Sequence, residues 1–200
     1  MSRAVHPIEA ESYAILRSRA GTGDLPPLTR AVVERVIHAS ADLGYRGDMV
    51  CDEDALAAGL AALRAGAPVV ADVAMVAAGI TSRAVVSRVG DPRAAELARA
   101  AGCTRSAAGV RVALADAGPG AVWVVGCAPT ALAELVALAG AARPALVVGL
   151  PVGFVGAVES KAALRASGLP AVSNVSEKGG SAVAAAAVNA LLHVIEEATA

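Results

Sequence analysis

Short, continuously apolar runs recur along this chain, and helical patterns separate them. Five runs fit buried strands, at 68–72, 84–89, 121–125, 145–150 and 170–175. Strands that are apolar at every position are typical of a parallel sheet covered by helices on both faces. The sequence therefore predicts an α/β fold with three layers, α/β/α, a mainly parallel sheet and right-handed crossovers.

Helical patterns fill most of the remaining chain. The segment 28–43 is the strongest, with Val32, Val33, Val36 and Ile37 at helical spacing and Gly44 as its expected end. Further helices are predicted at 8–19, 52–65, 92–101, 106–115, 129–139, 158–166 and 180–198, with a short strand at 48–51 and a loop at 21–27. We find no repeat or linker, so residues 1–200 are expected to form one domain.

Charge and aromatic content exclude several classes of protein. The chain has 17 Lys and Arg against 18 Asp and Glu, with no block of like charge. It therefore lacks the basic surface that nucleic-acid or membrane-surface binding requires. The aromatic residues are Tyr13, Tyr45, Trp123 and Phe154, too few for stacking on single-stranded nucleic acid.

The apolar segments do not indicate export or membrane insertion. The first nine residues have no apolar core, so we expect no secretory signal and a cytoplasmic protein. The apolar segment 181–195 contains Asn189 and His193 and is interpreted as a buried helix. Cys51, Cys103 and Cys127 are far apart, and we expect reduced, mostly buried thiols rather than zinc ligands.

Two glycine-rich junctions in the last third each link a predicted strand to a helix. They are Ala145–Lys161 and Asn174–Ala182, and each contains a lysine. Glycines let main-chain N–H groups approach a ligand, and a helix start adds partial positive charge, so the pair indicates a site for a ligand with several anionic groups. The alternative is that the glycines only make tight turns. Neither junction has the residue order of a P-loop or a dinucleotide fold.

His38 is the main candidate for acid–base chemistry. Glu34 and Asp42 lie one helical turn before and after it, so the sequence predicts that these carboxylates raise its pKa and favour a general acid. The alternative is an ordinary surface or interface histidine. Thr104–Ser106 opens a predicted helix, where Arg105 could clamp a carboxylate or Thr104 could act only as a cap.

These segments together resemble the precorrin-8X methylmutase family over nearly the whole chain. The similar segments include His6-Pro-Ile8, Glu11-Ser-Tyr13, Val36-Ile-His-Ala-Ser-Ala-Asp42, residues 71–81, Thr104-Arg-Ser-Ala-Ala108 and Ala128-Pro-Thr-Ala-Leu132. The most specific are Gly149–Lys161 and Lys178-Gly-Gly-Ser-Ala182. The segments His6-Pro-Ile8 and Val36–Asp42 look more like the cobalt-precorrin form of the family.

The resemblance implies a flavodoxin-like sheet and an isomerisation in corrin-ring biosynthesis. In that reaction a methyl group moves from C-11 to C-12 of the tetrapyrrole, with no cofactor and no metal ion supplied by the protein. The resemblance also implies a homo-oligomer, expected to be a homodimer, and does not say whether the substrate already contains cobalt.

The resemblance also assigns roles to individual residues. His38 takes the catalytic position, and Ser12 that of a substrate-contacting serine. The other implied substrate-binding residues are Arg17, Asp72, Met75, Thr81, Thr104, Arg105, Ser106, Gly153, Phe154, Lys161, Lys178, Gly179, Gly180 and Ser181.

Two residues depart from the family pattern. Glu177 stands where an arginine is common, and Cys127 where an asparagine is common. The first change puts one carboxylate contact in doubt. Two other functions stay open: a corrinoid carrier without catalysis, which the retained His38 disfavours, and a flavodoxin-like module for a phosphate ligand, which the missing nucleotide motif disfavours.

Overall fold

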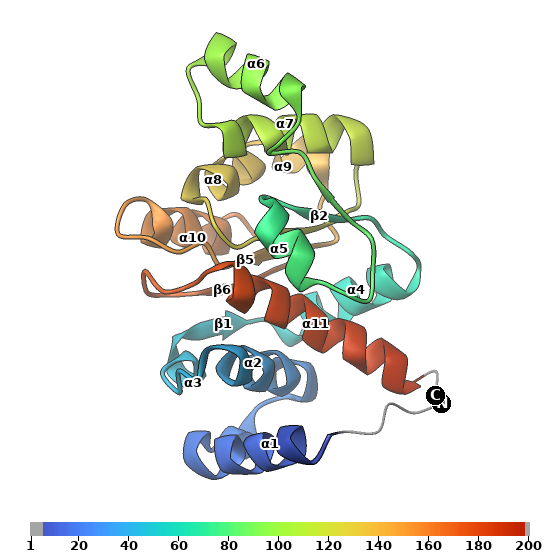
Figure 1. The fold of residues 1–200 in the computed structure, drawn as a ribbon, viewed down its shortest axis with the longest axis vertical. Coiled ribbons are helices and arrows are strands. Elements are labelled where there is room, and N and C mark those ends of the chain that lie inside the picture. Colours follow the sequence, from blue (N-terminus) through green and yellow to red (C-terminus); the bar gives the residue numbers. More distant parts are fainter. Residues whose placement is uncertain (1–5, 199–200) are drawn as a thin grey trace.

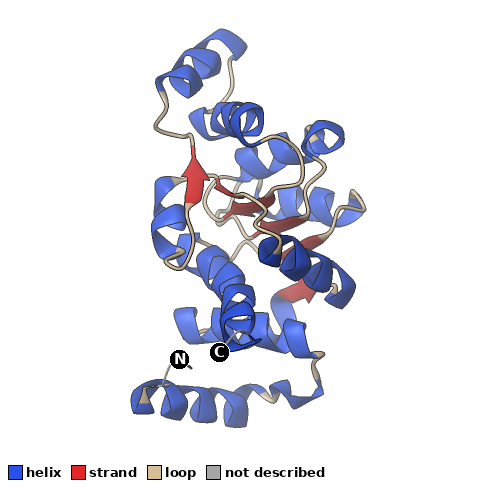
Figure 2. Ribbon diagram, turned by 90° about the vertical axis from the view of Figure 1, so that its right-hand side faces the viewer, coloured by secondary structure: helices blue, strands red, loops and turns tan. Residues whose placement is uncertain are grey.

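A six-stranded sheet lies between layers of helices in the computed structural model, which describes residues 6–198 (Figures 1 and 2). The strands are β1 (Met49–Cys51), β2 (Val69–Ala71), β3 (Val85–Ser87), β4 (Val122–Val125), β5 (Leu146–Gly149) and β6 (Ala171–Asn174). Their order is β1-β6-β5-β4-β2-β3; β1 is antiparallel to β6, and all other neighbours are parallel. The predicted three-layer fold is confirmed.

The five parallel strands have the order of a flavodoxin-like sheet. Counted from β2 as the first strand, that order is 2-1-3-4-5, to which β1 adds an antiparallel edge. The order in which strands are added to such a sheet reverses between β2 and β4, and ligands bind beyond the carboxyl ends of the strands near this point. Both predicted glycine-rich junctions follow strands, β5 and β6, at that edge.

Successive residues of each central strand face opposite helical layers. Leu146 and Val148 belong to the larger apolar cluster, whereas Val147 belongs to the other. The larger cluster includes α2 (Pro27–Ser40), α4 (Glu53–Arg64), α5 (Ala74–Gly79) and α11 (Ser181–Ala198). The other includes α7 (Arg105–Ala117), α8 (Pro129–Ala137), α9 (Ala139–Ala142) and α10 (Ala157–Ala166). Two helices lie outside these layers: α1 (Pro7–Ala20) on α2, and α6 (Pro92–Ala101) on α7.

Helix α11 is long and apolar enough to cross a membrane by length and composition alone. It packs along α2 and against α5 and the sheet, and Val183–Val188 are all buried there. The prediction of a buried core helix is confirmed.

Helix α2 ends three residues earlier than predicted. Ala41 adopts a left-handed conformation with φ 56°, so the expected end at Gly44 is wrong. The Ser40 hydroxyl accepts a hydrogen bond from the Asp42 N–H at 3.2 Å, and the Asp42 carboxylate accepts one from the Gly44 N–H at 2.8 Å. These side chains offer the main chain partners outside the helix, which favours a turn.

The other differences between the predicted and the observed secondary structure concern short elements. Residues 45–48, expected in part as strand, form the one-turn helix α3 (Tyr45–Asp48) before β1, and the loop at 21–27 contains the 3₁₀ turn η1 (Thr22–Asp24). Helices α5 and α9 were not predicted. Residues 1–5, on which part of the secretory-signal expectation depends, lie outside the described residues.

We expect Gly59→Ala to destabilise the fold, because α4 passes very close to β5 at this glycine. An added Cβ would lie 2.6 Å from Leu146 Cδ2. Overpacking costs about 1–3 kcal/mol, which outweighs the gain of about 1 kcal/mol in helix propensity. The control is Gly140→Ala in α9, where an added Cβ meets nothing within 4 Å and stability should stay equal or rise. Urea denaturation measures the free energy of unfolding of both variants. Equal changes in Gly59→Ala and Gly140→Ala would contradict the close approach of α4 to β5.

Candidate active site

His38 is held by two neighbouring residues of α1. Ser12 Oγ lies 2.9 Å from His38 Nδ1, and the Tyr13 ring stacks on the imidazole with centroids 4.9 Å apart and planes 6° from parallel. The structure therefore brings Ser12 and His38 together, as their assigned roles require. The sequence analysis did not assign Tyr13 to the site, although it adjoins Ser12.

The contact with Ser12 determines which imidazole nitrogen is available. Nδ1 is engaged by the serine hydroxyl, and Nε2 makes no hydrogen bond to any residue in the range 6–198. When Ser12 donates to Nδ1, the ring proton lies on Nε2, and in the imidazolium both nitrogens carry protons. In both states His38 can offer an N–H from Nε2 to a ligand.

A buried carboxylate fixes α1 on α2 and so sets the position of Ser12. The Glu34 side chain is 4% exposed and accepts hydrogen bonds from Arg17 at 2.8–3.1 Å and from Thr22 Oγ1 at 2.6 Å. Burial opposes ionisation of Glu34, but the hydrogen bonds from Arg17 and Thr22 leave its pKa lowered. Glu34 therefore serves Arg17 and Thr22, and its expected role as a carboxylate acting on His38 is wrong.

A groove of about 600 Å³ runs beside this contact, between α1, α2 and the second half of α11. Its lining contains the Tyr13 ring and charges of both signs: Arg17, Arg30, Arg35, Glu9, Glu34 and Glu197. Arg17 stays 60% exposed while it binds Glu34, so its guanidinium can also meet a ligand. His38 lies on the same stripe of α2 as Arg35, one turn further along the helix.

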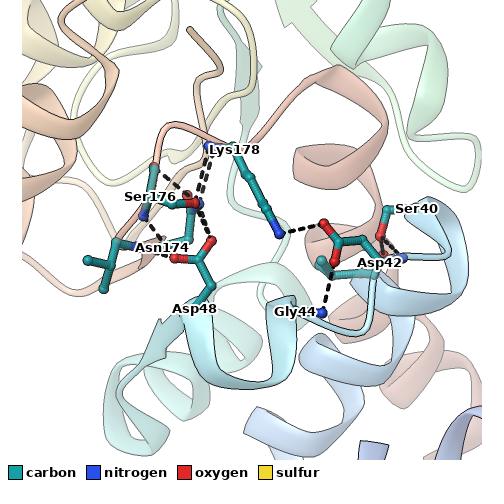
Figure 3. A network of polar contacts seen from close by, with 9 residues as sticks. Ser40, Asp42, Gly44, Asp48, Asn174, Ser176 and Lys178 are labelled. Atoms are coloured by element: carbon teal, nitrogen blue, oxygen red, sulfur yellow. Dashed lines mark hydrogen bonds and ion pairs between the residues drawn. The ribbon is translucent and has the colours of Figure 1, made fainter. Parts of the chain in front are cut away.

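Asp42, which was also predicted to act on His38 from the next turn of the helix, is engaged elsewhere. It lies past the end of α2 and binds Lys178, with Asp42 Oδ2 2.7 Å from Lys178 Nζ (Figure 3). This ion pair lowers the pKa of Asp42 and raises that of Lys178. A Cβ on Gly44 would lie 2.9 Å from both Lys178 Nζ and Asp42 Oδ1, so the glycine leaves room for the ion pair.

The two glycine-rich junctions lie against each other. The Gly180 N–H donates to the Leu150 carbonyl at 2.9 Å, and the Gly153 N–H donates to the Glu177 carbonyl at 3.1 Å. Gly179 has φ +155°, and a Cβ there would lie 2.6 Å from the Pro151 carbonyl oxygen. These N–H groups join the loops, so the tight-turn interpretation explains part of the glycine pattern.

Two of the predicted substrate-binding residues are inside the protein. Lys161 is 0% exposed, and its ammonium binds Asn174 Oδ1 and main-chain carbonyls of residues 176 and 178. Asp72 is 5% exposed and accepts hydrogen bonds from the N–H groups of residues 126–128 at 2.9–3.1 Å. Both side chains are used within the protein and act on loops at the sheet edge.

Asp72 lies at the point where the strand order of the sheet reverses. It follows β2, and the three N–H groups that it binds follow β4. Burial raises its pKa, and the N–H groups act in the opposite direction without cancelling that effect. An anion cradle at this position is therefore filled by the protein's own carboxylate. Cys127 contributes its main-chain N–H, which an asparagine would supply equally.

The other predicted contacts lie along the surface. Met75 and Phe154 are 72% and 96% exposed, and Thr81 and Arg105 are also exposed. Thr104 caps α7 by accepting from the N–H of residue 107, which confirms the cap interpretation, and its Oγ1 lies 2.8 Å from Thr130 Oγ1. Within residues 6–198, no hydrogen bond joins Thr104, Arg105 or Ser106 to His38 or Lys178. Gly153, Gly179, Gly180 and Ser181 lie at the two junctions.

The thiols and acidic groups do not assemble into a metal site in the described range. No group of three His, Cys, Asp or Glu residues there could hold a metal ion. Cys51 and Cys103 are partly buried, but Cys127 is exposed, so the expectation of mostly buried thiols is wrong for that residue.

Comparison with known proteins gives consistent similarities. The precorrin-8X methylmutase family model matches residues 7–194. The cobalt-precorrin-8 methylmutase of Salmonella typhimurium is 40% identical, over 96% of both chains, and the precorrin-8X methylmutase of Pseudomonas aeruginosa is 42% identical, over 92% of this chain and 93% of that one. The solved precorrin-8X methylmutase of Thermus thermophilus has a TM-score of 0.84 at 39% identity, over 95% of this chain and 97% of that one.

We expect Glu34→Gln to destabilise the protein at pH 7 and to have little effect in acid. The folded-state pKa of Glu34 lies below its ordinary value of about 4.3, so its stabilisation is present above that value and is lost as pH falls through the folded-state pKa. Urea denaturation at pH 7 and below pH 4 measures the difference. The control is Glu11→Gln, at an exposed position of α1. If Glu34→Gln lowers the free energy of unfolding by the same amount at both pH values, the assigned ionised state of Glu34 is contradicted.

Proposed function

The chain belongs to the precorrin-8X methylmutase family, and on this premise we propose that His38 is the acid of its methyl shift. Members of this family are isomerases of cobalamin biosynthesis. The substrate is a tetrapyrrole, precorrin-8X or its cobalt form, and the product is hydrogenobyrinate or cobyrinate. The methyl group moves from C-11 to C-12 without net oxidation or reduction.

The contact between Ser12 and His38 is the observation that carries the proposal. Ser12 engages Nδ1 and Tyr13 covers one face of the ring, so the imidazole is held in one orientation, and Nε2 has no hydrogen-bond partner among residues 6–198. From Nε2, His38 donates a proton or a hydrogen bond to a ring nitrogen of the macrocycle. This favours the tautomer in which the methyl group migrates. General acid catalysis contributes typically 10²–10⁴-fold.

Charged groups on both sides of His38 support binding of a substrate with several carboxylates. The groove on one side along α2 contains Arg30 as well as Arg17 and Arg35, which are paired with Glu34 and Glu9, and Lys178 lies on the other side. Holding the macrocycle at both ends restricts it to one orientation over His38, which lowers the entropic part of the barrier. The exposed Phe154 and Met75 offer apolar contact to the faces of the ring.

The remaining parts of the proposal concern assembly and location. We propose a cytoplasmic homodimer with shared sites. The exposed apolar side chains of α1, Ile8 at 71% and Ile15 at 50%, lie two turns apart and support contact with a second copy. In such a dimer, the substrate bound at His38 of one chain can also contact Thr104, Arg105 and Ser106 of the other. The protein contributes no cofactor and no metal ion of its own.

We expect His38→Ala to lower turnover by at least 10²-fold while corrinoid binding is retained. Anaerobic incubation with precorrin-8X or cobalt-precorrin-8, followed by ultraviolet–visible spectra, measures turnover. Ser12→Ala should lower kcat less, because the acid remains but is less well oriented. Ser18→Ala is its control, because that hydroxyl donates to the Ile15 carbonyl of its own helix. Unchanged turnover in His38→Ala would remove the histidine from the mechanism. Tight binding by the parent protein without turnover would indicate a carrier instead.

We expect Glu177→Arg to tighten corrinoid binding at low salt. Glu177 is exposed beside Lys178, so reversing its charge makes the local field more positive. The gain for an exposed charge is at most about 1 kcal/mol and decreases as salt is added. Titration calorimetry with cobyrinic acid at two salt concentrations measures it, with Glu96→Arg on the exposed surface of α6 as the control. Equal affinities of Glu177→Arg and the parent at low salt would show that no carboxylate approaches this loop.

A further inference from the structure

Lys161 is a buried charge that the proposed reaction does not use. It lies in the Glu-Ser-Lys segment that the sequence analysis assigned to the substrate, yet its side chain is enclosed by the protein. Burial lowers its pKa to about 8, against the attraction of Asp48, so at pH 7 it is mainly an ammonium with three protons to donate. A buried ammonium is unfavourable unless it is fully hydrogen-bonded.

All three protons of Lys161 are directed at one loop and its entry. Lys161 Nζ donates to Asn174 Oδ1 at 2.8 Å, to the Lys178 carbonyl at 2.8 Å and to the Ser176 carbonyl. These oxygens belong to the end of β6 and to the segment 175–180, which leads into α11. We call this segment the β6–α11 loop.

The loop has little structure of its own. It contains no helix or strand, and Gly179 and Gly180 have φ +155° and +127°, in a region that glycine enters readily and that leaves the free chain many alternatives. Its conformation must therefore be set by groups outside it.

Asp48 also binds this loop, by accepting hydrogen bonds from the loop's N–H and O–H groups. Its carboxylate accepts from the N–H groups of Val175 at 3.1 Å and Ser176 at 2.8 Å, and from Ser176 Oγ at 2.6 Å (Figure 3). Every partner of this carboxylate is a donor. An amide at position 48 would present an NH₂ group to at least one of them.

Asn174 connects the two charges. Its Oδ1 accepts from Lys161, and its Nδ2 donates to Asp48 Oδ2 at 2.8 Å and to the Lys178 carbonyl at 2.9 Å. The cation thus binds loop carbonyls, the anion binds loop N–H groups, and one amide aligns both.

The consequence of this network falls on Lys178. Its carbonyl is held by Lys161 and Asn174, and its N–H donates to Ser176 Oγ at 3.2 Å. Both main-chain groups of Lys178 are therefore fixed. Only its side chain can move, from Asp42 to a ligand carboxylate. That side chain is 42% exposed.

We propose that Lys161 and Asp48 are positioning residues that hold the β6–α11 loop so that Lys178 meets a carboxylate of the substrate. The choice of ligand rests on the proposed function, whereas the effect on the loop does not. Lys161 and Asp48 touch no substrate atom in this arrangement.

The test uses Lys161→Met and Asp48→Asn, with Arg165→Met as the matched control. Arg165 lies one turn after Lys161 on α10, and its hydrogen bonds within the described part of the chain go to β6, through Ser173 Oγ and the Asn174 carbonyl. Hydrogen exchange of the ligand-free protein should become at least about tenfold faster at residues 176–180 in the two test variants, the order expected for one lost charge-assisted hydrogen bond. Arg165→Met should leave that exchange unchanged.

Affinity for cobyrinic acid then tests the link to Lys178. Lys161→Met should weaken binding about as much as Lys178→Met does, and the double variant should bind no more weakly than Lys178→Met alone. Additive losses would overturn the proposal, as would unchanged exchange at 176–180. If Lys161→Met does not fold, Asp48→Asn and its double variant with Lys178→Met provide the same comparison. Faster exchange in a protein whose parent binds no corrinoid would contradict the proposed function and leave the loop assignment intact.

Discussion

The ion pair of Glu34 with Arg17 is the interaction on which the candidate active site depends. Helix α1 has one buried side chain, Leu16, so apolar packing alone holds it weakly against α2. The buried Glu34 carboxylate, satisfied by Arg17 and Thr22, fixes that contact. Since Ser12 and Tyr13 reach His38 from α1, the orientation of the imidazole depends on this buried ion pair.

The same physical arrangement recurs at the carboxyl edge of the sheet. Asp72 gathers three N–H groups after β4, and Lys161 with Asp48 binds the loop after β6. Asp72 and Lys161 are buried and Asp48 is partly buried, and all three are compensated largely by main-chain groups, so removing one would leave several polar groups unsatisfied. Buried charges thus give rigid shape to loops that glycines would otherwise leave flexible.

The sequence predicted the layers well and the charged contacts poorly. Apolar strands such as 121–125 were found because burial on both faces leaves a local pattern. The end of α2 was missed because Ser40 and Asp42 bind the main chain only in the folded turn. The pairing of Glu34 with Arg17, and the burial of Lys161, depend on how distant segments pack, which spacing along one helix does not reveal. His38 was a candidate from its helix position and from the family resemblance, and Ser12 came from the resemblance alone. Tyr13 lay in a segment similar to the family but was given no role, and Asp48 gave no signal.

A crystal structure of the protein with bound hydrogenobyrinic acid tests the central claim most directly. We predict that a ring atom of the corrinoid lies within hydrogen-bond distance of His38 Nε2, that Ser12 still engages Nδ1, and that a peripheral carboxylate replaces Asp42 on Lys178. A corrinoid bound elsewhere, with His38 facing only solvent or protein, would contradict the assignment of this histidine as the acid.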